Sequence, residues 1–408
     1  MTPARHAART VTVLGAGQIF AWGATYYLPA VLAWPIAQDT GWPLTWIVGA
    51  LSLGTLVSGL AAPAVGRRID RIGGRPVLAA SAAMFAVGLG GLAIAPGLLA
   101  YLACWLLLGL GMAAGLYDAA FGTLGRLYGQ DARRHITVLT LFGGFASTVC
   151  WPLSAWLVAE VGWRGACLAY ACLHLCLVLP AYLWLLPRQP AGDAPAVRDA
   201  GDAQAAPDTD DAAARAKTGQ HRRFLLLAAS GALTAAIGAV VAVHLLALLQ
   251  GRGISLAAAV ALGALVGPAQ VGARLVEMLL GRYHHPVWTM AAAALLMFTG
   301  TALLYGGGFS LAVALVLYGA GMGIHSIARG AVPLALFGAA QYASMMGRLA
   351  RPGAIIGALA PTLVAMLWAA TSDGAVLLAL GGCTALNLLV VGLLLLDWRR
   401  SAPAGADR

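Results

Sequence analysis

Long apolar stretches recur along the whole 408-residue chain and constrain its fold more than any other feature. A helix needs about 20 apolar residues to cross a bilayer. Twelve stretches of that kind are predicted to be membrane-spanning helices, at residues 11–36, 43–65, 77–95, 98–124, 137–159, 164–186, 223–249, 256–280, 286–305, 309–332, 345–368 and 374–397. Only 10% of the residues are charged, against about 25% in soluble proteins, so we expect an all-α, multi-pass membrane protein.

One segment between the sixth and seventh stretches has a different composition. Residues 187–222 contain alanine, proline, glycine and six aspartates, with almost no large apolar side chain. Such a segment cannot bury a core, so we expect a flexible linker. The predicted organisation is a six-helix bundle at 1–186, the linker at 187–222, a second six-helix bundle at 223–398 and a tail at 399–408.

The basic residues predict the orientation of the chain in the membrane. With the N-terminus placed in the cytoplasm, 22 of the 25 basic residues fall in cytoplasmic segments. The outer loops then hold only Arg164 and Arg252, and Arg274 lies within a span. We therefore expect twelve spans with both termini cytoplasmic.

The composition also limits the kinds of partner and ligand that we expect. The formal charge of +10 comes from residues spread singly between apolar spans, so no nucleic-acid surface is expected. The six cysteines lie within apolar stretches at spacings that fit no metal motif, so neither a metal nor a cofactor is expected.

The first stretch is too long for a cleavable signal peptide and has no small-residue cleavage site. Short termini and loops favour a bacterial inner membrane, and the protein is expected to be a monomer.

A charged turn separates the second and third spans. Its sequence, from Gly66 to Pro76, reads GRRIDRIGGRP. Glycines allow a sharp turn and a close approach of helices. The carboxylate of Asp70 can accept hydrogen bonds from nearby arginines or from a helix N-terminus.

This turn resembles the loop signature of the major facilitator superfamily, roughly G-x-L-x-D-R-x-G-R-[RK]. The sequence departs from it at Arg68, where the family favours leucine, and at Gly74, where it favours a basic residue. The positions that match are Gly66, Asp70, Arg71, Gly73 and Arg75.

The resemblance implies a secondary transporter, in which two six-helix bundles rock about a central site. It also implies that Asp70 and Arg71 help to latch the bundles on the cytoplasmic side. Asp118 and Arg126 are expected to join that charge network.

The second half of the chain echoes the first. Residues 63–70 read PAVGRRID and residues 268–277 read PAQVGARLVE, each at the end of the second span of its half. Each segment is followed by a glycine and an arginine, Gly74 with Arg75 and Gly281 with Arg282. Internal repeats of this size are typical of transporter folds.

Two departures weaken the interpretation as a drug/proton antiporter. Many proton-coupled members have an arginine in the fourth span, in a pattern like R-x-x-x-G-x-G, where this chain has Trp105 before Gly109 and Gly111. Drug exporters have G-P-x-x-G-G in the fifth span. Here residues 150–155 read CWPLSA, which keeps only Pro152.

The eighth span carries two ionisable groups, Arg274 and Glu277, one helical turn apart. Each costs about 2.5–3.5 kcal/mol at membrane depth unless it has a partner or a wet cavity. One interpretation is a structural ion pair between them. The other is that Arg274 binds a substrate anion, because this region resembles organic-anion and monocarboxylate carriers with an arginine in this span.

Two histidines lie within spans. His244 falls in the outer part of the seventh and His325 in the inner half of the tenth. A lone histidine in a helix is more often a satisfied hydrogen-bonding residue, but its titration near neutrality could also carry a coupled proton. Asp118 and Glu277 compete for that role.

The first span carries Gln18, Trp22 and Tyr26, spaced four residues apart and so on one helical face. This face is either packed or lines a solute cavity with aromatic walls. Further side chains that could contribute to such a cavity are Tyr117, Trp151 and Gln270. Pro152 and Pro268 are hinges or tolerated kinks.

The sequence contains no nucleotide-binding or hydrolase signature. The favoured function is secondary active transport of a small polar or anionic solute by alternating access, coupled to an ion such as the proton. The alternatives are an efflux pump for amphipathic toxic compounds or metallophores and, in another class, a membrane sensor or enzyme. No large soluble domain and no catalytic cluster supports the last two.

Overall fold

The structure is a computed structural model that describes residues 3–188, 209–304 and 309–401. All regular structure within these residues is helical, and they contain no strand. The helices fall into two compact units. Unit 1 consists of Met1–Gly192 and Gln341–Ala358, and unit 2 of Asp193–Ala340 and Leu359–Arg408.

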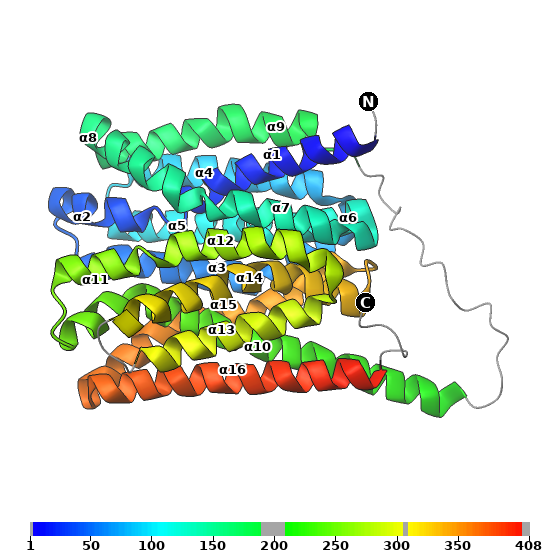
Figure 1. The fold of residues 1–408 in the computed structure, drawn as a ribbon. Helices are drawn as coiled ribbons and strands as arrows, with labels where there is room; N and C mark the ends of the chain where they lie inside the picture. Colours follow the sequence, from blue (N-terminus) through cyan, green and yellow to red (C-terminus); the bar gives the residue numbers. More distant parts are fainter. Residues whose placement is uncertain (1–2, 189–208, 305–308, 402–408) are drawn as a thin grey trace. The chain divides into compact units, whose positions relative to one another are not determined.

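Unit 1 contains the first nine α-helices, drawn in blue to green in Figure 1. They are α1 (Pro3–Gly23), α2 (Pro29–Thr40), α3 (Leu44–Ile72), α4 (Gly74–Ile94), α5 (Leu98–Gly115), α6 (Tyr117–Tyr128), α7 (Ala132–Gly144), α8 (Ala146–Leu173) and α9 (Leu179–Leu185). A 3-10 turn, η1 (Gly129–Asp131), precedes α7, and a π-helical turn, η2 (His174–Val178), precedes α9.

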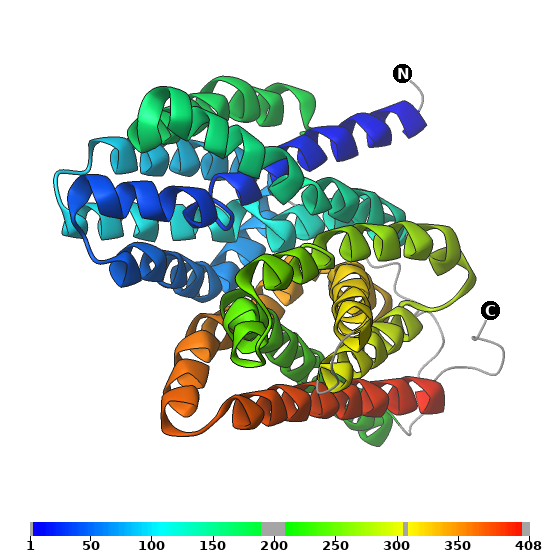
Figure 2. The same cartoon turned by 60° about the vertical axis from the view of Figure 1, so that its left-hand side comes forward.

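Unit 2 holds the remaining helices, with α15 shared between the units. They are α10 (Thr209–Gly251), α11 (Leu256–Gly263), α12 (Val266–Leu280), α13 (Pro286–Leu303), α14 (Phe309–Phe337), α15 (Tyr342–Ala370) and α16 (Asp373–Ser401), with a 3-10 turn η3 (Gly281–Tyr283) after α12. α16, drawn in red, packs along α10 and α13 (Figure 2).

Four predicted spans are broken in the structure. The first span divides where α1 ends at Gly23 and α2 begins at Pro29, which has no N–H to donate. The fourth divides at Leu116, whose extended backbone (φ −83°, ψ −169°) separates α5 from α6. In the fifth, α7 ends at Gly144 and α8 begins at Ala146. The eighth divides between α11 and α12. Hydropathy reports where a helix can lie in lipid but not where its backbone turns, so the sequence predicted each as continuous.

The fifth and sixth spans meet at a glycine. Within α8 only Gly162 has non-helical angles (φ 69°, ψ 175°), in the left-handed region that favours glycine. The kink lies between the predicted spans 137–159 and 164–186, so one helix changes direction where a loop was expected.

The predicted linker lies largely outside the described residues, at 189–208. Its last residues, from Thr209, form the beginning of α10, where four alanines between 212 and 216 favour helix. The end of the tail, 402–408, also lies outside the described part.

Nine segments of the described chain are long and apolar enough to cross a membrane. One of them, Leu98–Leu185, covers three of the predicted spans at once. The structure is thus that of an all-helical protein with many candidate spans.

Candidate functional site

In unit 1 the candidate residues of the first span form one connected group. The Trp22 indole N–H donates to Oε1 of Gln18 over 3.2 Å. The Trp22 ring lies 5.5 Å from that of Tyr26, edge to face, and 5.2 Å from that of Tyr117. Tyr26 lies in the turn after α1, not on a continuous helix, yet it stays beside Trp22.

Two more aromatic side chains extend this group. Tyr27 lies 6.3 Å from Trp22 and 5.9 Å from Trp151, centroid to centroid. Trp151 is 45% exposed, whereas Tyr117 is buried and stacks on Phe121. Trp22, Tyr26, Tyr27, Tyr117 and Trp151, from α1, α6, α8 and the turn after α1, form what we call the aromatic cluster.

Gln18 connects the aromatic cluster to the break in the fourth span. Its Nε2 donates to the carbonyl of Gly115 over 2.6 Å, at the last residue of α5. A helix interruption frees carbonyls that need new donors in lipid, and Gln18 supplies one. Gln18 is completely buried. Its side-chain amide satisfies the free carbonyl at the helix break and accepts the hydrogen bond that orients Trp22.

The charged turn begins where α3 ends. Gly73 has φ 84°, so a side chain here would be strained. A carboxylate oxygen of Asp70 accepts the backbone N–H of Ser344 over 2.7 Å, in the first turn of α15. A negative charge at a helix N-terminus is stabilised by the free N–H groups and the helix dipole.

Two arginines near the turn, Arg126 and Arg75, donate to backbone carbonyls. Buried Arg126 of α6 donates to the carbonyl of Asp70, and Arg75 donates to the carbonyl of Leu183 at the end of α9. Arg71 is exposed. Asp118 lies in the first turn of α6, about two turns before Arg126.

Glycines let α3 and the first half of α15 pack closely. A Cβ on Gly66 would lie 2.2 Å from the carbonyl oxygen of Ala343, and one on Gly347 the same distance from that of Ala62. At Gly59 it would lie 2.4 Å from Cβ of Ala354. Gly66, the first glycine of the motif, is therefore needed for the close approach of α15, whether or not it also helps the chain to turn.

In unit 2, Arg274 lies buried between α12 and α14. Its Nε donates to the Gly323 carbonyl over 3.2 Å and to the Ser326 hydroxyl over 3.1 Å. Its Nη2 donates to Oε1 of Gln270 over 3.3 Å. These bonds fix the plane and direction of the guanidinium.

Glu277 is also buried, one turn along α12. Its Oε1 accepts the hydroxyl of Thr289 on α13 over 2.7 Å, and its Oε2 lies 3.6 Å from Nε2 of His284. Neither partner was expected from the sequence, because both lie beyond the end of α12.

The two histidines occupy different parts of unit 2. His325 is buried on α14, one residue before Ser326 in the sequence. His244 of α10 contacts α15, where its Nε2 lies 2.9 Å from the Pro361 carbonyl and its ring 5.7 Å from Trp368. His174, in the π-helical turn of unit 1, is completely buried against Phe85 and was not singled out from the sequence.

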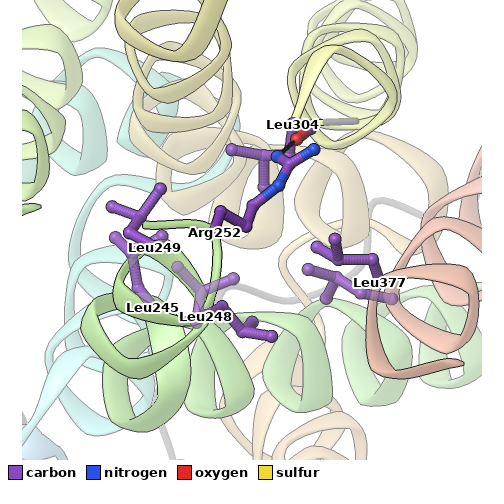
Figure 3. Close-up of a pocket in the computed structure, with 8 residues that line it drawn as sticks. Leu245, Leu248, Leu249, Arg252, Leu304 and Leu377 are labelled. Carbon is purple, nitrogen blue, oxygen red and sulfur yellow. Dashed lines mark hydrogen bonds between the residues drawn. The ribbon is translucent and has the colours of Figure 1, made fainter. Parts of the chain in front are cut away.

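A small enclosed cavity lies beside Arg252 (Figure 3). Its volume is about 10 Å³ and most of its wall is leucine, including Leu248 and Leu377. That is room for about one water molecule. Nη1 of Arg252 donates to the carbonyl of Leu304. This bond links the residue after α10 to the residue after α13. The cavity itself is too small to hold a solute.

The fold and these sites define a class: an all-α membrane protein whose buried polar residues gather at helix breaks and close helix contacts. The sequence model of the Major Facilitator Superfamily matches residues 14–361, and the chain belongs to that family. The resemblance inferred from the charged turn is thereby confirmed.

Three known proteins are similar to this chain, one in structure and two in sequence. The human organic anion transporter MFSD10 (TETRAN) superposes with a TM-score of 0.68 at 19% identity, over 96% of this chain and 100% of that one. Human monocarboxylate transporter 11 is 36% identical over 163 residues, 39% of this chain and 32% of that protein. A Pseudomonas aeruginosa protein named transcription regulatory protein OpdE is 32% identical over 183 residues, 42% of this chain and 43% of that protein. The matched region thus spans less than half of either curated relative.

Proposed function

We propose that this protein is a secondary transporter that moves a small organic anion, with a carboxylate as the recognised group, by alternating access. Membership of the Major Facilitator Superfamily supports transport, not catalysis. An anion is favoured as the substrate because Arg274, a permanently charged group, is buried in unit 2 and held in a fixed orientation.

The geometry of Arg274 suits carboxylate recognition. A guanidinium presents several N–H groups in one plane and can hold a carboxylate through two parallel hydrogen bonds. Its bonds to Gln270, Gly323 and Ser326 order the side chain before substrate arrives, which lowers the entropy lost on binding. The names of two similar proteins, an organic anion transporter and a monocarboxylate transporter, favour the same substrate class.

The proposal includes twelve spans, cytoplasmic termini, a bacterial inner membrane and a monomer. The distribution of arginines supports the orientation. Coupling to protons is part of the proposal, and His325 is the favoured carrier because it is buried on α14 beside Ser326, a partner of Arg274.

We assign the contact between Asp70 and Ser344 to a cytoplasmic latch. Asp70 reaches the first turn of α15 from the end of α3, and Arg126 holds the backbone of Asp70 from α6. Breaking one hydrogen bond at a helix N-terminus costs little, so the latch can open and close during transport.

Uptake by reconstituted vesicles tests the role of Arg274. Radiolabelled monocarboxylates would be supplied to vesicles holding the wild type, Arg274→Lys or Arg274→Ala, with an imposed pH gradient. We expect at least about tenfold lower uptake for Arg274→Ala and a raised KM for Arg274→Lys, since lysine cannot bind in two-point fashion. The exposed Arg134→Lys serves as the control. Undiminished uptake by both Arg274 variants would overturn the binding role.

A second candidate function is export of amphipathic toxic compounds or metallophores. The aromatic cluster of unit 1 favours it, because Trp22, Tyr27 and Trp151 offer ring faces to an apolar solute. This candidate predicts that expression raises resistance to such compounds and that Arg274→Ala exports them as well as the wild type does.

A further inference from the structure

Unit 2 carries an open apolar groove between α13 and α16. The groove has a volume of about 480 Å³. One lining residue, Phe298, comes from α13. The others come from α16: Ala385, Leu388, Leu389, Gly392, Leu393 and Leu396.

A basic and aromatic group of residues lies at the C-terminal end of this groove. The guanidinium of Arg399 lies 4.9 Å from the ring centroid of Trp288, at the beginning of α13. The ring of Trp398 stacks on that of His285 at 4.5 Å. Arg400 is exposed at the same end of α16. These contacts bring the loop before α13 to the end of α16.

The groove and the arginines share one face of α16. At 100° per residue, Ala385, Leu389, Gly392 and Leu396 fall within about 60° of one another, and Arg399 and Arg400 extend the same stripe to about 100°. The groove residues 385–396 cover about 16 Å along the helix axis. Half of the hydrocarbon core is about 15 Å thick, so the groove matches the depth of one leaflet.

The charge at this end is complementary to an anion. The acid next to these arginines, Asp397, is held by Arg222 at 3.1 Å and by Arg223 at 2.7 Å, both on α10. Within the described part of the chain, no carboxylate forms an ion pair with Arg399 or Arg400. A third arginine, Arg282, is exposed in the loop between α12 and α13 and lies over the ring of Tyr283.

We propose that this groove and its basic end form a binding site for one anionic phospholipid. The phosphate would lie against Arg399 and Arg400, and one acyl chain would fill the groove beside Gly392. Basic pockets between membrane helices bind anionic headgroups, and tryptophan and tyrosine favour the same interfacial depth. The site is independent of the transported solute.

Native mass spectrometry of the full-length protein in detergent tests the site. Delipidated protein would be titrated with phosphatidylglycerol or with phosphatidylcholine of the same chain length. We expect one tightly held phosphatidylglycerol and weaker binding of phosphatidylcholine. In Arg399→Gln with Arg400→Gln the affinity for phosphatidylglycerol should fall about 30-fold, since each interfacial arginine contributes about fivefold and the two factors multiply.

A second variant tests the groove without changing charge. A Cβ on Gly392 meets no atom within 4 Å, so Gly392→Leu directs its side chain into the open space proposed for the acyl chain. We expect it to weaken phosphatidylglycerol binding and leave the unfolding temperature unchanged. Gly90→Leu, also in open space but on α4, is the matched control. Arg5→Gln with Arg134→Gln is the control for charge.

Three outcomes would overturn the proposal. One is equal phosphatidylglycerol affinity in the wild type and the double arginine variant. Another is an equal loss in the charge control, which would indicate general attraction to a positive protein. The third is displacement of the lipid by glycerol 3-phosphate at equal concentration, which would show that the groove adds nothing.

Discussion

Several polar side chains of the described residues bond to backbone groups where helices end or approach one another. Gln18 satisfies the carbonyl of Gly115 at a helix break, and Asp70 accepts an N–H from the beginning of α15. Arg274 donates to a carbonyl of α14. In lipid an unsatisfied backbone group costs several kcal/mol, so residues of this kind determine where helices can end or approach. They also remain the best candidates for contact with solute.

The sequence predicted some of these residues but not their partners. Asp70 was expected to accept hydrogen bonds from arginines or a helix N-terminus, and the structure gives it Ser344, 274 residues away. Gln18 was expected on an aromatic face, and its bond to Gly115 was not foreseen. Residue type limits what a side chain can do, whereas its partner depends on packing between helices distant in sequence.

Removing the carboxylate at the α15 N-terminus should destabilise unit 1. We expect Asp70→Ala to lower the unfolding free energy by about 1–2 kcal/mol, because the Ser344 N–H loses its acceptor and the helix its charge. Asp70→Asn keeps an acceptor and should lose less. Thermal unfolding in detergent measures both effects, with Glu160→Gln, an exposed acid within α8, as control. Identical unfolding temperatures in the wild type and Asp70→Ala would show that the contact adds no stability.

The end of unit 1 that holds Asp39 should have a pH-dependent stability. Asp39, at the end of α2, accepts hydrogen bonds from Arg164 and, over 3.0 Å, from the Trp163 indole. The bond from Arg164, followed by that from Trp163, lowers the pKa of Asp39. A lowered pKa contributes stability above the ordinary value of about 3.9, and this is lost as pH falls through the folded-state pKa.

Comparison with Asp39→Asn measures this contribution. At pH 7 the wild type should unfold at the higher temperature, and the difference should shrink below about pH 4 as the wild-type carboxyl becomes protonated. Arg164→Gln should behave like Asp39→Asn. A difference that is constant from pH 7 to pH 3 would mean that the charge of Asp39 is not its source.

At the scale of helices, hydropathy located many elements well. The spans expected at 345–368 and 374–397 correspond to α15 and α16. The breaks near Tyr26, at Leu116 and between α11 and α12 were missed, because a broken helix is as apolar as a continuous one. Turn dihedrals depend on tertiary donors such as Gln18, which a hydropathy window does not contain.

The close contact between α3 and α15 makes a strong prediction about glycine. Gly66→Val would place atoms against the backbone of Ala343, with Cβ 2.2 Å from its carbonyl oxygen, so the beginning of α15 must move. We expect a loss of about 1–3 kcal/mol in unfolding free energy, typical of overpacking. Gly49→Ala, on the same helix but in open space, should be neutral or slightly stabilising. A Gly66→Val protein as stable as the wild type would contradict this packing.

At the scale of the whole molecule, the sequence was sufficient to predict the family. A charged turn, many apolar spans and a weak internal repeat favoured the Major Facilitator Superfamily, and its match over residues 14–361 confirms this. The grouping of Gln341–Ala358 with unit 1 could not be predicted, since it follows from the glycine contacts of α3 and not from chain order. The substrate is the least constrained property, because it depends on few side chains.

We propose that the bilayer forces this chain into paired sets of six spans, with the linker and the tail on the cytoplasmic side. Single cysteines at Ala205→Cys, Ala404→Cys and Gln38→Cys, in a protein whose six native cysteines have been replaced, would be treated with an impermeant thiol reagent in intact and opened cells. We expect that only Gln38→Cys reacts in intact cells and that the other two react only after opening. Labelling of Ala205→Cys and Ala404→Cys from opposite sides of the membrane would contradict it.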